Sequence, residues 1–79
     1  MGQPMSRTYY VKALWDAEAR LWYSQSDIPG LVLESETLAE FEEAMTTLGP
    51  ELLAENENIH NQPVNIQFLV SETRAFEVI

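Results

Sequence analysis

Apolar and polar residues alternate along the first regular segment of the chain, Thr8 to Ala17. One face of this segment is wholly apolar and the other is mixed, a pattern that predicts a half-buried strand. Its β-branched and aromatic content favours the same structure. The apolar face consists of Tyr9, Val11, Ala13 and Trp15, and the mixed face of Tyr10, Lys12, Leu14 and Asp16.

Two short polar connections follow this strand. Residues 16–20 suit a hairpin turn, which makes the next apolar segment, Arg20 to Ser26, an antiparallel neighbour of the first strand. Pro29 and Gly30 then predict a type II turn, because proline fixes one φ angle and glycine permits a positive one. Leu31 to Glu34 is expected to form a short third strand.

A helix is expected to begin at Thr37, because Thr37-Leu38-Ala39-Glu40 fits the capping box. Apolar residues then recur at helical spacing and form one stripe. They are Leu38, Phe41, Met45, Leu48 and Leu52. Pro50 interrupts this stripe, so the pattern leaves open one kinked helix or a second short helix. The apolar face continues beyond Pro50, which favours the kink, and the asparagines of residues 56–58 end the helix.

The clearest alternation runs from Val64 to Thr73 and predicts a last strand. The tail from Arg74 to Ile79 either extends this strand or pairs elsewhere. The order strand, strand, strand, helix, strand predicts an α+β fold, with one helix packed on one face of an antiparallel sheet. In this β-β-β-α-β arrangement, the last strand returns across the helix to pair within the same sheet.

The other sheet face has no helix to cover it, and apolar residues are expected there. Alternation places Tyr10 and Leu14 on this face, and Trp22 is a third candidate. An apolar patch of this kind usually marks an interface. Because a chain of this length also builds only a small core, we expect a homodimer.

Length and charge narrow the classes of function. The 79 residues are expected to form one domain, residues 1–79, with residues 1–7 disordered. Cysteine is absent, which excludes disulfides and thiolate metal sites. The chain shows neither a signal peptide nor an apolar run of membrane-spanning length, so we expect a cytoplasmic domain with no membrane partner. The net charge of −9 argues against direct nucleic-acid binding and favours a basic partner.

Several short segments, taken in order, carry a resemblance to a known family. The pattern is a strand, a turn, an aromatic strand, a D-x-P-G loop, a short strand and a T-x-x-E helix start. Over residues 8–73 the chain resembles the HicB-like antitoxin superfamily and, more narrowly, a small single-domain family of unknown function within it. The segments are residues 10–16 (YVKALWD), 21–24 (LWYS), 26–31 (SDIPGL) and 36–40 (ETLAE).

The resemblance implies a truncated ribonuclease-H-like sheet without working catalytic acids. Better-studied members of the superfamily bind HicA, a small basic ribonuclease toxin, and occlude its active site. Many of them also carry a C-terminal DNA-binding module. Here the chain ends at Ile79, soon after its last strand, so we do not expect autoregulation through DNA.

Candidate catalytic and metal-binding groups have simpler explanations. Asp16, Glu34 and Glu36 lie near strand ends, where a ribonuclease-H-like enzyme holds magnesium, but their spacing shows no convergence. His60 lies in a polar loop and is expected to be exposed to solvent. Base stacking on aromatic residues normally needs basic neighbours, and the chain has only 4 Lys and Arg residues. We therefore expect no enzyme activity, no metal and no cofactor.

Partner or dimer contacts are expected from the strands and from the loop before the third strand. The candidate residues are Tyr10, Leu14, Trp15, Trp22, Asp27, Ile28, Pro29 and Gly30. The loop has a second interpretation, a tight turn that keeps strand register. Likewise, the helix glutamates either mimic RNA phosphates toward a basic toxin or form a solvated face.

The leading hypothesis is a non-catalytic, HicB-like binding module that neutralises a small basic ribonuclease. The alternative is a stand-alone homodimeric domain that binds a small ligand or another protein. A small basic protein encoded next to this chain would favour the first hypothesis, and its absence would favour the second.

Overall fold

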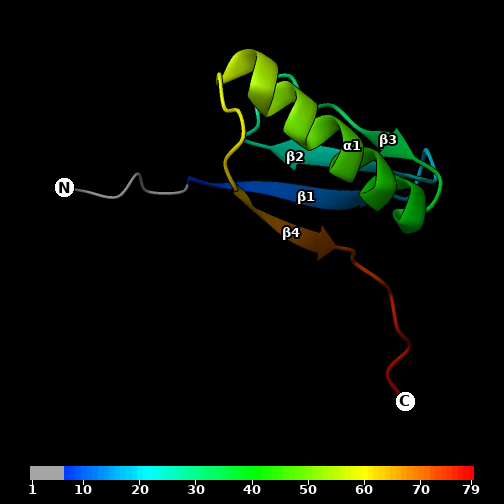
Figure 1. The fold of residues 1–79 in the computed structure, drawn as a ribbon. Coiled ribbons are helices and arrows are strands. Elements are labelled where there is room, and N and C mark those ends of the chain that lie inside the picture. Colours follow the sequence, from blue (N-terminus) through cyan, green and yellow to red (C-terminus); the bar gives the residue numbers. More distant parts are fainter. Residues whose placement is uncertain (1–6) are drawn as a thin grey trace.

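The computed structural model describes residues 7–79 and contains one helix and a 4-stranded sheet (Figure 1). The strand order is β3-β2-β1-β4, and α1 packs across one face. The predicted α+β class and element order are confirmed. The elements are β1 (Thr8–Asp16), β2 (Leu21–Ser26), β3 (Glu34–Ser35), α1 (Leu38–Asn56) and β4 (Asn65–Ser71). The predicted disorder of residues 1–7 falls, except for Arg7, outside the described residues.

The sheet is mixed, which corrects the expectation of a wholly antiparallel sheet. β1 pairs with β2 in antiparallel and with β4 in parallel orientation. The cause is the connection through α1, which carries the chain from the β3 edge back to the start of β1. β4 then runs alongside β1, from the Thr8–Asn65 pair to the Leu14–Ser71 pair. Parallel neighbours require such a crossover, and it leaves β4 as an edge strand with one free side.

The turn between β1 and β2 is built around Asp16. One carboxylate oxygen of Asp16 accepts the N–H groups of Glu18 and Ala19 at 3.0 and 3.1 Å. Its carbonyl accepts the Arg20 N–H at 2.7 Å, and Arg20 adopts a left-handed φ of 58°. The predicted hairpin is therefore confirmed.

The third strand is shorter than expected and comes later. The sequence predicts Leu31 to Glu34, but the ladder covers only Glu34–Ser35. Just before it, the hydroxyl of Ser24 accepts the Leu33 N–H at 2.8 Å, so a side chain takes the place of a ladder carbonyl. Leu31 and Leu33 are both buried and contribute to the core, and the Ser24 N–H still bonds the Leu33 carbonyl at 3.1 Å, although the ladder does not extend to this pair.

α1 begins as predicted, with Thr37 as its N-cap. Thr37 Oγ1 accepts the Glu40 N–H at 3.1 Å, which satisfies one of the donors left free at a helix start. The second half of the capping box differs from the usual form. The Thr37 hydroxyl donates to the Glu40 carboxylate at 3.0 Å, whereas in the usual box the carboxylate accepts the backbone N–H of the cap.

The buried side of α1 differs from the predicted stripe in its second half, where Gly49 and Leu53 are buried, while Leu38 and Leu52 are partly buried. Its buried residues are Phe41, Met45, Gly49 and Leu53. Leu48, which the spacing assigned to the stripe, is 37% exposed. Gly49 lies against the sheet instead, and a Cβ there would be 3.4 Å from Cδ1 of Ile66. The missing side chain leaves room for the Ile66 side chain of β4 beside the helix.

One continuous helix of 19 residues runs through Pro50, so the alternative of a second helix that begins there is wrong. The chain leaves the helix after Asn56 and turns at Asn58, whose φ of 53° is left-handed. Asparagine was expected to end the helix in this way. The Ile59 N–H then bonds the Leu53 carbonyl at 3.3 Å.

The core lies between α1 and the sheet face beneath it. Its residues come from β1, β2, the segment that leads to β3, and α1. They are Tyr9, Val11, Ala13, Trp22, Ile28, Leu31, Leu33, Phe41, Met45 and Leu53. Within the described residues, no helix combines the length and apolarity needed to cross a membrane.

Candidate functional site

The loop from Asp27 to Gly30 forms the predicted type II turn. The Leu31 N–H bonds the Ile28 carbonyl at 3.1 Å, and Gly30 has the positive φ, 83°, that this turn requires. Ile28 is only 2% exposed and belongs to the core, so it offers no surface to a partner. Pro29 and Gly30 are exposed.

The same loop ties the sheet to the helix. The Asp27 carboxylate accepts the Tyr10 N–H at 2.9 Å, on β1. The Asn56 side-chain amide donates to the Pro29 carbonyl at 3.1 Å, at the end of α1. These contacts support the interpretation of the loop as a turn that fixes register.

The two tryptophans lie on the helix side of the sheet. Trp15 and Trp22 are opposite each other in the β1–β2 register, with ring centroids 5.2 Å apart and a tilt of 57°. The expectation that Trp22 lies on the uncovered face is therefore wrong. The register decides this, because directly opposed residues share a face and Trp15 shares its face with the buried Val11 and Ala13.

The uncovered face of the sheet, called here the open sheet face, mixes apolar and polar side chains. Tyr10 and Leu14 lie on it, as expected, and both are half-buried. Leu14 is opposite Tyr23, which is 40% exposed. Lys12 lies between Gln25 and Leu69 on the neighbouring strands, so the face carries a cation at its centre. The residues of this face include Tyr10, Lys12, Leu14, Tyr23, Gln25, Glu34, Gln67, Leu69 and Ser71.

The exposed side of α1 is strongly acidic. This acidic helix face consists of Glu40, Glu42, Glu43, Glu51 and Glu55, all exposed. In the part of the chain that the structure describes, ion pairs join only Arg7 to Glu57 and Arg74 to Glu72, so no cation neutralises these five glutamates. The sequence suggested this face, and the helix places its carboxylates on one rigid element.

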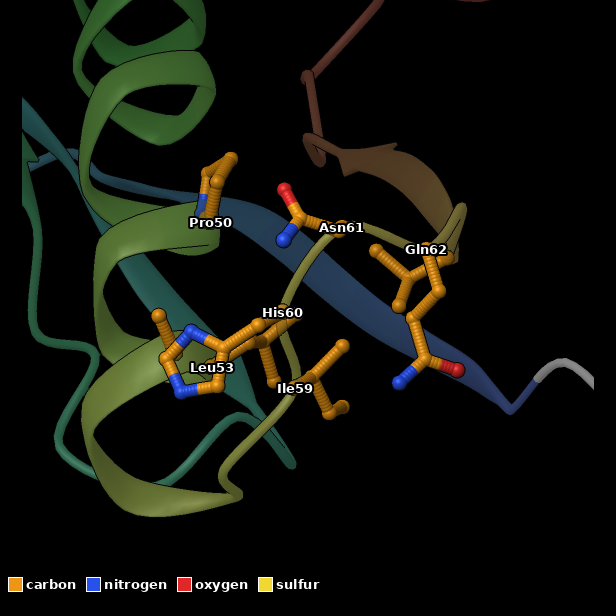
Figure 2. Close-up of a pocket in the computed structure, with 8 residues that line it drawn as sticks. Pro50, Leu53, Ile59, His60, Asn61 and Gln62 are labelled. Atoms are coloured by element: carbon orange, nitrogen blue, oxygen red, sulfur yellow. The ribbon is translucent and has the colours of Figure 1, made fainter.

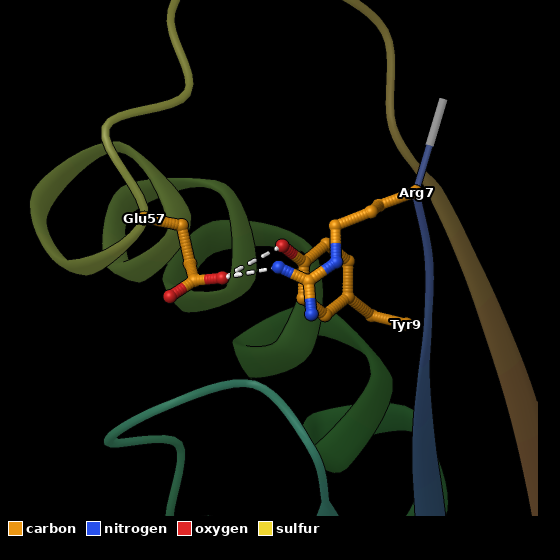
Figure 3. A network of polar contacts seen from close by, with 3 residues as sticks. All are labelled: Arg7, Tyr9 and Glu57. Carbon is orange, nitrogen blue, oxygen red and sulfur yellow. Dashed lines mark hydrogen bonds and ion pairs between the residues drawn. The ribbon is translucent and has the colours of Figure 1, made fainter. Parts of the chain in front are cut away.

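A polar cluster joins the start of β1 to the end of α1 (Figure 3). One Glu57 carboxylate oxygen accepts from the Arg7 guanidinium at 2.8 Å and from the Tyr9 hydroxyl at 3.1 Å. The Arg7 guanidinium also lies over the Tyr9 ring, 5.0 Å from its centroid. Burial, and then the hydrogen bond to Glu57, raise the pKa of the Tyr9 hydroxyl. The sequence analysis missed this cluster, since no local pattern links residues so far apart.

A pocket of about 300 Å³ lies between the second half of α1 and the segment that leads to β4 (Figure 2). Its lining combines apolar side chains with polar groups, among them His60, which is exposed as expected. The His60 Nε2 lies 3.2 Å from the Asn58 side-chain oxygen. The lining residues are Pro50, Leu53, Ala54, Ile59, His60, Asn61, Gln62 and Val64.

The acidic residues considered for a metal site have other positions and partners. Asp16 holds the amides of the β1–β2 turn, and Glu34 is opposite Tyr23 in the sheet. Across residues 7–79, the structure brings no three histidine or carboxylate side chains together in an arrangement suited to a metal ion.

The model of a family described as a domain of unknown function, DUF1902, matches residues 8–78. The chain belongs to the DUF1902 family. The match extends from β1 through β4 and well into the tail, so the DUF1902 domain includes residues 72–78.

A solved structure agrees with this assignment. The crystal structure of the hypothetical protein TTHA1013 from the extremely thermophilic bacterium Thermus thermophilus is similar to this chain, with 38% sequence identity and a TM-score of 0.67. The similarity covers 91% of this chain and 100% of the Thermus chain. No curated protein matches the sequence. The DUF1902 fold is thus shared, and neither comparison assigns it an activity.

Proposed function

We propose that this DUF1902 domain is a cytoplasmic, non-catalytic binding module that neutralises a small basic ribonuclease, as a HicB-like antitoxin does. The observation that carries the proposal is the acidic helix face. Five glutamates are exposed on α1, and no cation of the described chain pairs with them. Such a surface attracts a basic protein and repels nucleic acid.

The positions of the positive charges also support a basic partner for the acidic helix face. Arg7 and Arg74 are already paired with carboxylates of this chain. The remaining two are Lys12, on the open sheet face, and Arg20, in the β1–β2 turn, and neither forms an ion pair with a glutamate of α1 in the described residues. The exposed glutamates of α1 therefore keep their negative charge unpaired within the described residues, which favours rapid association with a cationic partner.

The mode of inhibition that we propose is steric cover aided by charge. Carboxylates at helical spacing present negative oxygens to cationic groups that would otherwise bind RNA phosphates. The helix is rigid, with a capped start and a buried side, so these carboxylates need little ordering when the partner binds. The resemblance to HicB-like antitoxins supplies the class of partner, a small basic ribonuclease.

The test is inhibition of a small basic HicA-like ribonuclease encoded next to this chain. We expect the chain to abolish RNA cleavage at an equimolar ratio, with an association rate that falls steeply as salt is raised. The Glu43→Gln/Glu51→Gln/Glu55→Gln variant should slow association at least about tenfold. Glu18→Gln/Glu34→Gln/Glu36→Gln removes the same charge elsewhere and should associate nearly as fast as the parent. Equal loss in both variants, or no inhibition by the parent, would contradict the proposal.

A second candidate is a stand-alone homodimeric domain that binds a small ligand, and the pocket beside α1 favours it. The pocket, of about 300 Å³, offers apolar contacts from Leu53 and Ile59 and hydrogen-bonding groups from Asn61 and Gln62. The test is to record backbone amide NMR spectra of the chain while compounds of a fragment library are added. Shifts confined to residues 59–64 and the facing turn of α1 would support it, and unperturbed spectra would count against it.

A further inference from the structure

The free edge of β4 lacks the features that usually protect an edge strand. Its sequence, NIQFLVS, contains no charged residue and no proline, although 22% of the whole chain is charged. Edge strands are normally blunted by charge, proline, a bulge or a covering element, because their open hydrogen bonds pair readily with other chains. In the described structure no element covers the far side of β4.

The apolar surface at this edge continues into the tail, residues 72–79. On β4 itself, Val70 is 48% exposed although it lies on the helix side of the sheet. In the tail, Phe76 is 80% and Val78 is 96% exposed. Figure 1 shows the tail running away from the sheet and the helix, and all its residues are exposed. Residues up to 78 nevertheless belong to the DUF1902 match, so the tail is part of the domain.

The tail is poorly suited to folding back on its own β4. The tightest return along the same edge would be a hairpin at Ser71–Arg74, with Glu72 and Thr73 at its centre. Two-residue hairpin loops demand positive φ angles and strongly prefer Asn-Gly, Asp-Gly or Gly-containing pairs. Glu72 and Thr73 supply none of these, and no glycine, asparagine or aspartate follows in the tail, which favours an occupant from another molecule.

We propose that the occupant is a second copy of this chain, whose tail pairs antiparallel with β4 around a two-fold axis at Thr73. In this register Val70 lies opposite the partner's Phe76, and Phe68 opposite the partner's Val78. Directly opposed residues share a face, so these two apolar pairs and their two symmetry-related copies fall on the helix side.

This register also places residues of opposite charge opposite each other. Glu72 lies opposite the partner's Arg74, and the symmetric pair forms on the other side of the axis. Within one chain these two side chains already pair at 2.8 Å, although both belong to an exposed segment. Across the axis they become cross-strand pairs, which stabilise a ladder when their charges are opposite. The uncharged β4 lets two acidic chains meet without bringing carboxylates of the two strands together along the rest of the edge.

The proposed dimer is a continuous eight-stranded sheet, twice the 4-stranded sheet of one chain, with both helices on the same side. It leaves the exposed side of α1 free, so it does not depend on the ribonuclease partner. It deepens the homodimeric candidate of the preceding section by naming the segment that forms the interface. The ribonuclease assay and the mass measurement below therefore fail or succeed separately.

The first test is the mass of the full chain in solution, by light scattering after size-exclusion chromatography at about neutral pH. We expect about twice the 9.0 kDa of one chain. Phe76→Asp should give the monomer mass with an unchanged thermal unfolding midpoint in dilute solution, because Phe76 lies outside the core. Val32→Asp is the matched control, since Val32 is 79% exposed in a loop, and it should stay dimeric. A monomeric parent, or a dimer that survives Phe76→Asp, would overturn the proposal.

The second test fixes the register and uses the absence of cysteine. Thr73→Cys places one thiol of each copy at the axis, where opposed Cα atoms of an antiparallel pair are about 4.5–5.5 Å apart and within reach of a disulfide. Mild oxidation should therefore link the two copies covalently. Ala17→Cys, in the exposed β1–β2 turn, should stay unlinked under the same conditions. Equal linkage of both variants, or none of Thr73→Cys, would overturn the proposed axis.

Discussion

An interior strand, β1, and an edge strand, β4, share the same alternating pattern but differ in how far their helix-side residues are buried. On β1, the helix-side residues Val11 and Ala13 are fully buried between α1 and the neighbouring strands. On β4, the helix-side Val70 remains 48% exposed, and the alternation runs on into a tail whose Phe76 is 80% exposed. The difference lies in what covers each strand. α1 and two neighbouring strands enclose β1, whereas β4 has one neighbour and a free edge.

The largest expected effect on stability is the difference between substituting a buried phenylalanine, Phe41, and an exposed one, Phe76. Phe41 is fully buried and its ring stacks on Phe68 at a centroid distance of 6.0 Å. Phe41→Ala should lower the free energy of unfolding by about 3–5 kcal/mol. That is a large share of the total stability of a domain of this size.

Phe76→Ala is the comparison within the tail. In dilute solution, where chains are monomeric, it should change the unfolding free energy by less than about 0.5 kcal/mol. Urea unfolding curves for both variants test the contrast. A similar loss for the two substitutions would show that the tail packs on its own domain and would remove the contrast between the enclosed core and the exposed edge.

The second effect sharpens the contact between α1 and β4. Gly49→Leu should destabilise the domain by about 1–3 kcal/mol, because its side chain has no room against Ile66 and Ile28. Gly49→Ala should instead be neutral or stabilise by up to about 1 kcal/mol, since alanine favours the helix. Its Cβ would meet Ile66 Cδ1 at 3.4 Å, which is a van der Waals contact. Thermal unfolding of both variants tests this prediction. A loss of stability in Gly49→Ala would mean that the space between Gly49 and Ile66 is too small for a methyl group.

Local chemistry explains which parts of the fold the sequence predicted. The β1–β2 turn and the helix start follow from groups within a few residues of one another, such as the Asp16 carboxylate and the Thr37 hydroxyl. The type II turn at Pro29-Gly30 was predicted on the same basis. Each of these predictions was correct because the hydrogen bonds that form the structure join residues close together in the sequence.

The sequence predictions that were wrong or incomplete concern features that depend on residues far apart in the chain. The short β3 depends on a Ser24 hydroxyl that caps Leu33, and the parallel β4 depends on where α1 returns the chain. Gly49 rather than Leu48 faces the sheet because Ile66 lies there. The Arg7–Glu57 contact joins residues 50 positions apart, and no periodicity in the sequence reports it.

A smaller effect separates the start of α1 from its exposed middle. Thr37→Ala should cost about 1 kcal/mol, because it leaves the Glu40 N–H without its acceptor. Thr47→Ala is the matched control. Its hydroxyl donates only to the Glu43 carbonyl on the exposed side, at 3.2 Å, and alanine is the better helix former. Chemical unfolding should therefore show a loss for Thr37→Ala alone, and equal losses would contradict the role of the cap.

The smallest effect is a change of stability with pH at the cluster that joins β1 to α1. Burial and the hydrogen bond to Glu57 raise the pKa of Tyr9 in the folded state. The neutral hydroxyl is thus favoured by folding, so its contribution is complete below the unfolded pKa of about 10 and is lost as the pH rises through the folded value. The unfolding midpoint of the parent should fall as the pH is raised above the pKa of an unperturbed tyrosine, about 10. Tyr9→Phe has no proton to lose there, so part of this fall should disappear, whereas Tyr23→Phe, at a site 40% exposed, should retain it. Parallel pH profiles for the parent and Tyr9→Phe would show that Tyr9 ionises as freely in the folded chain as in the unfolded one.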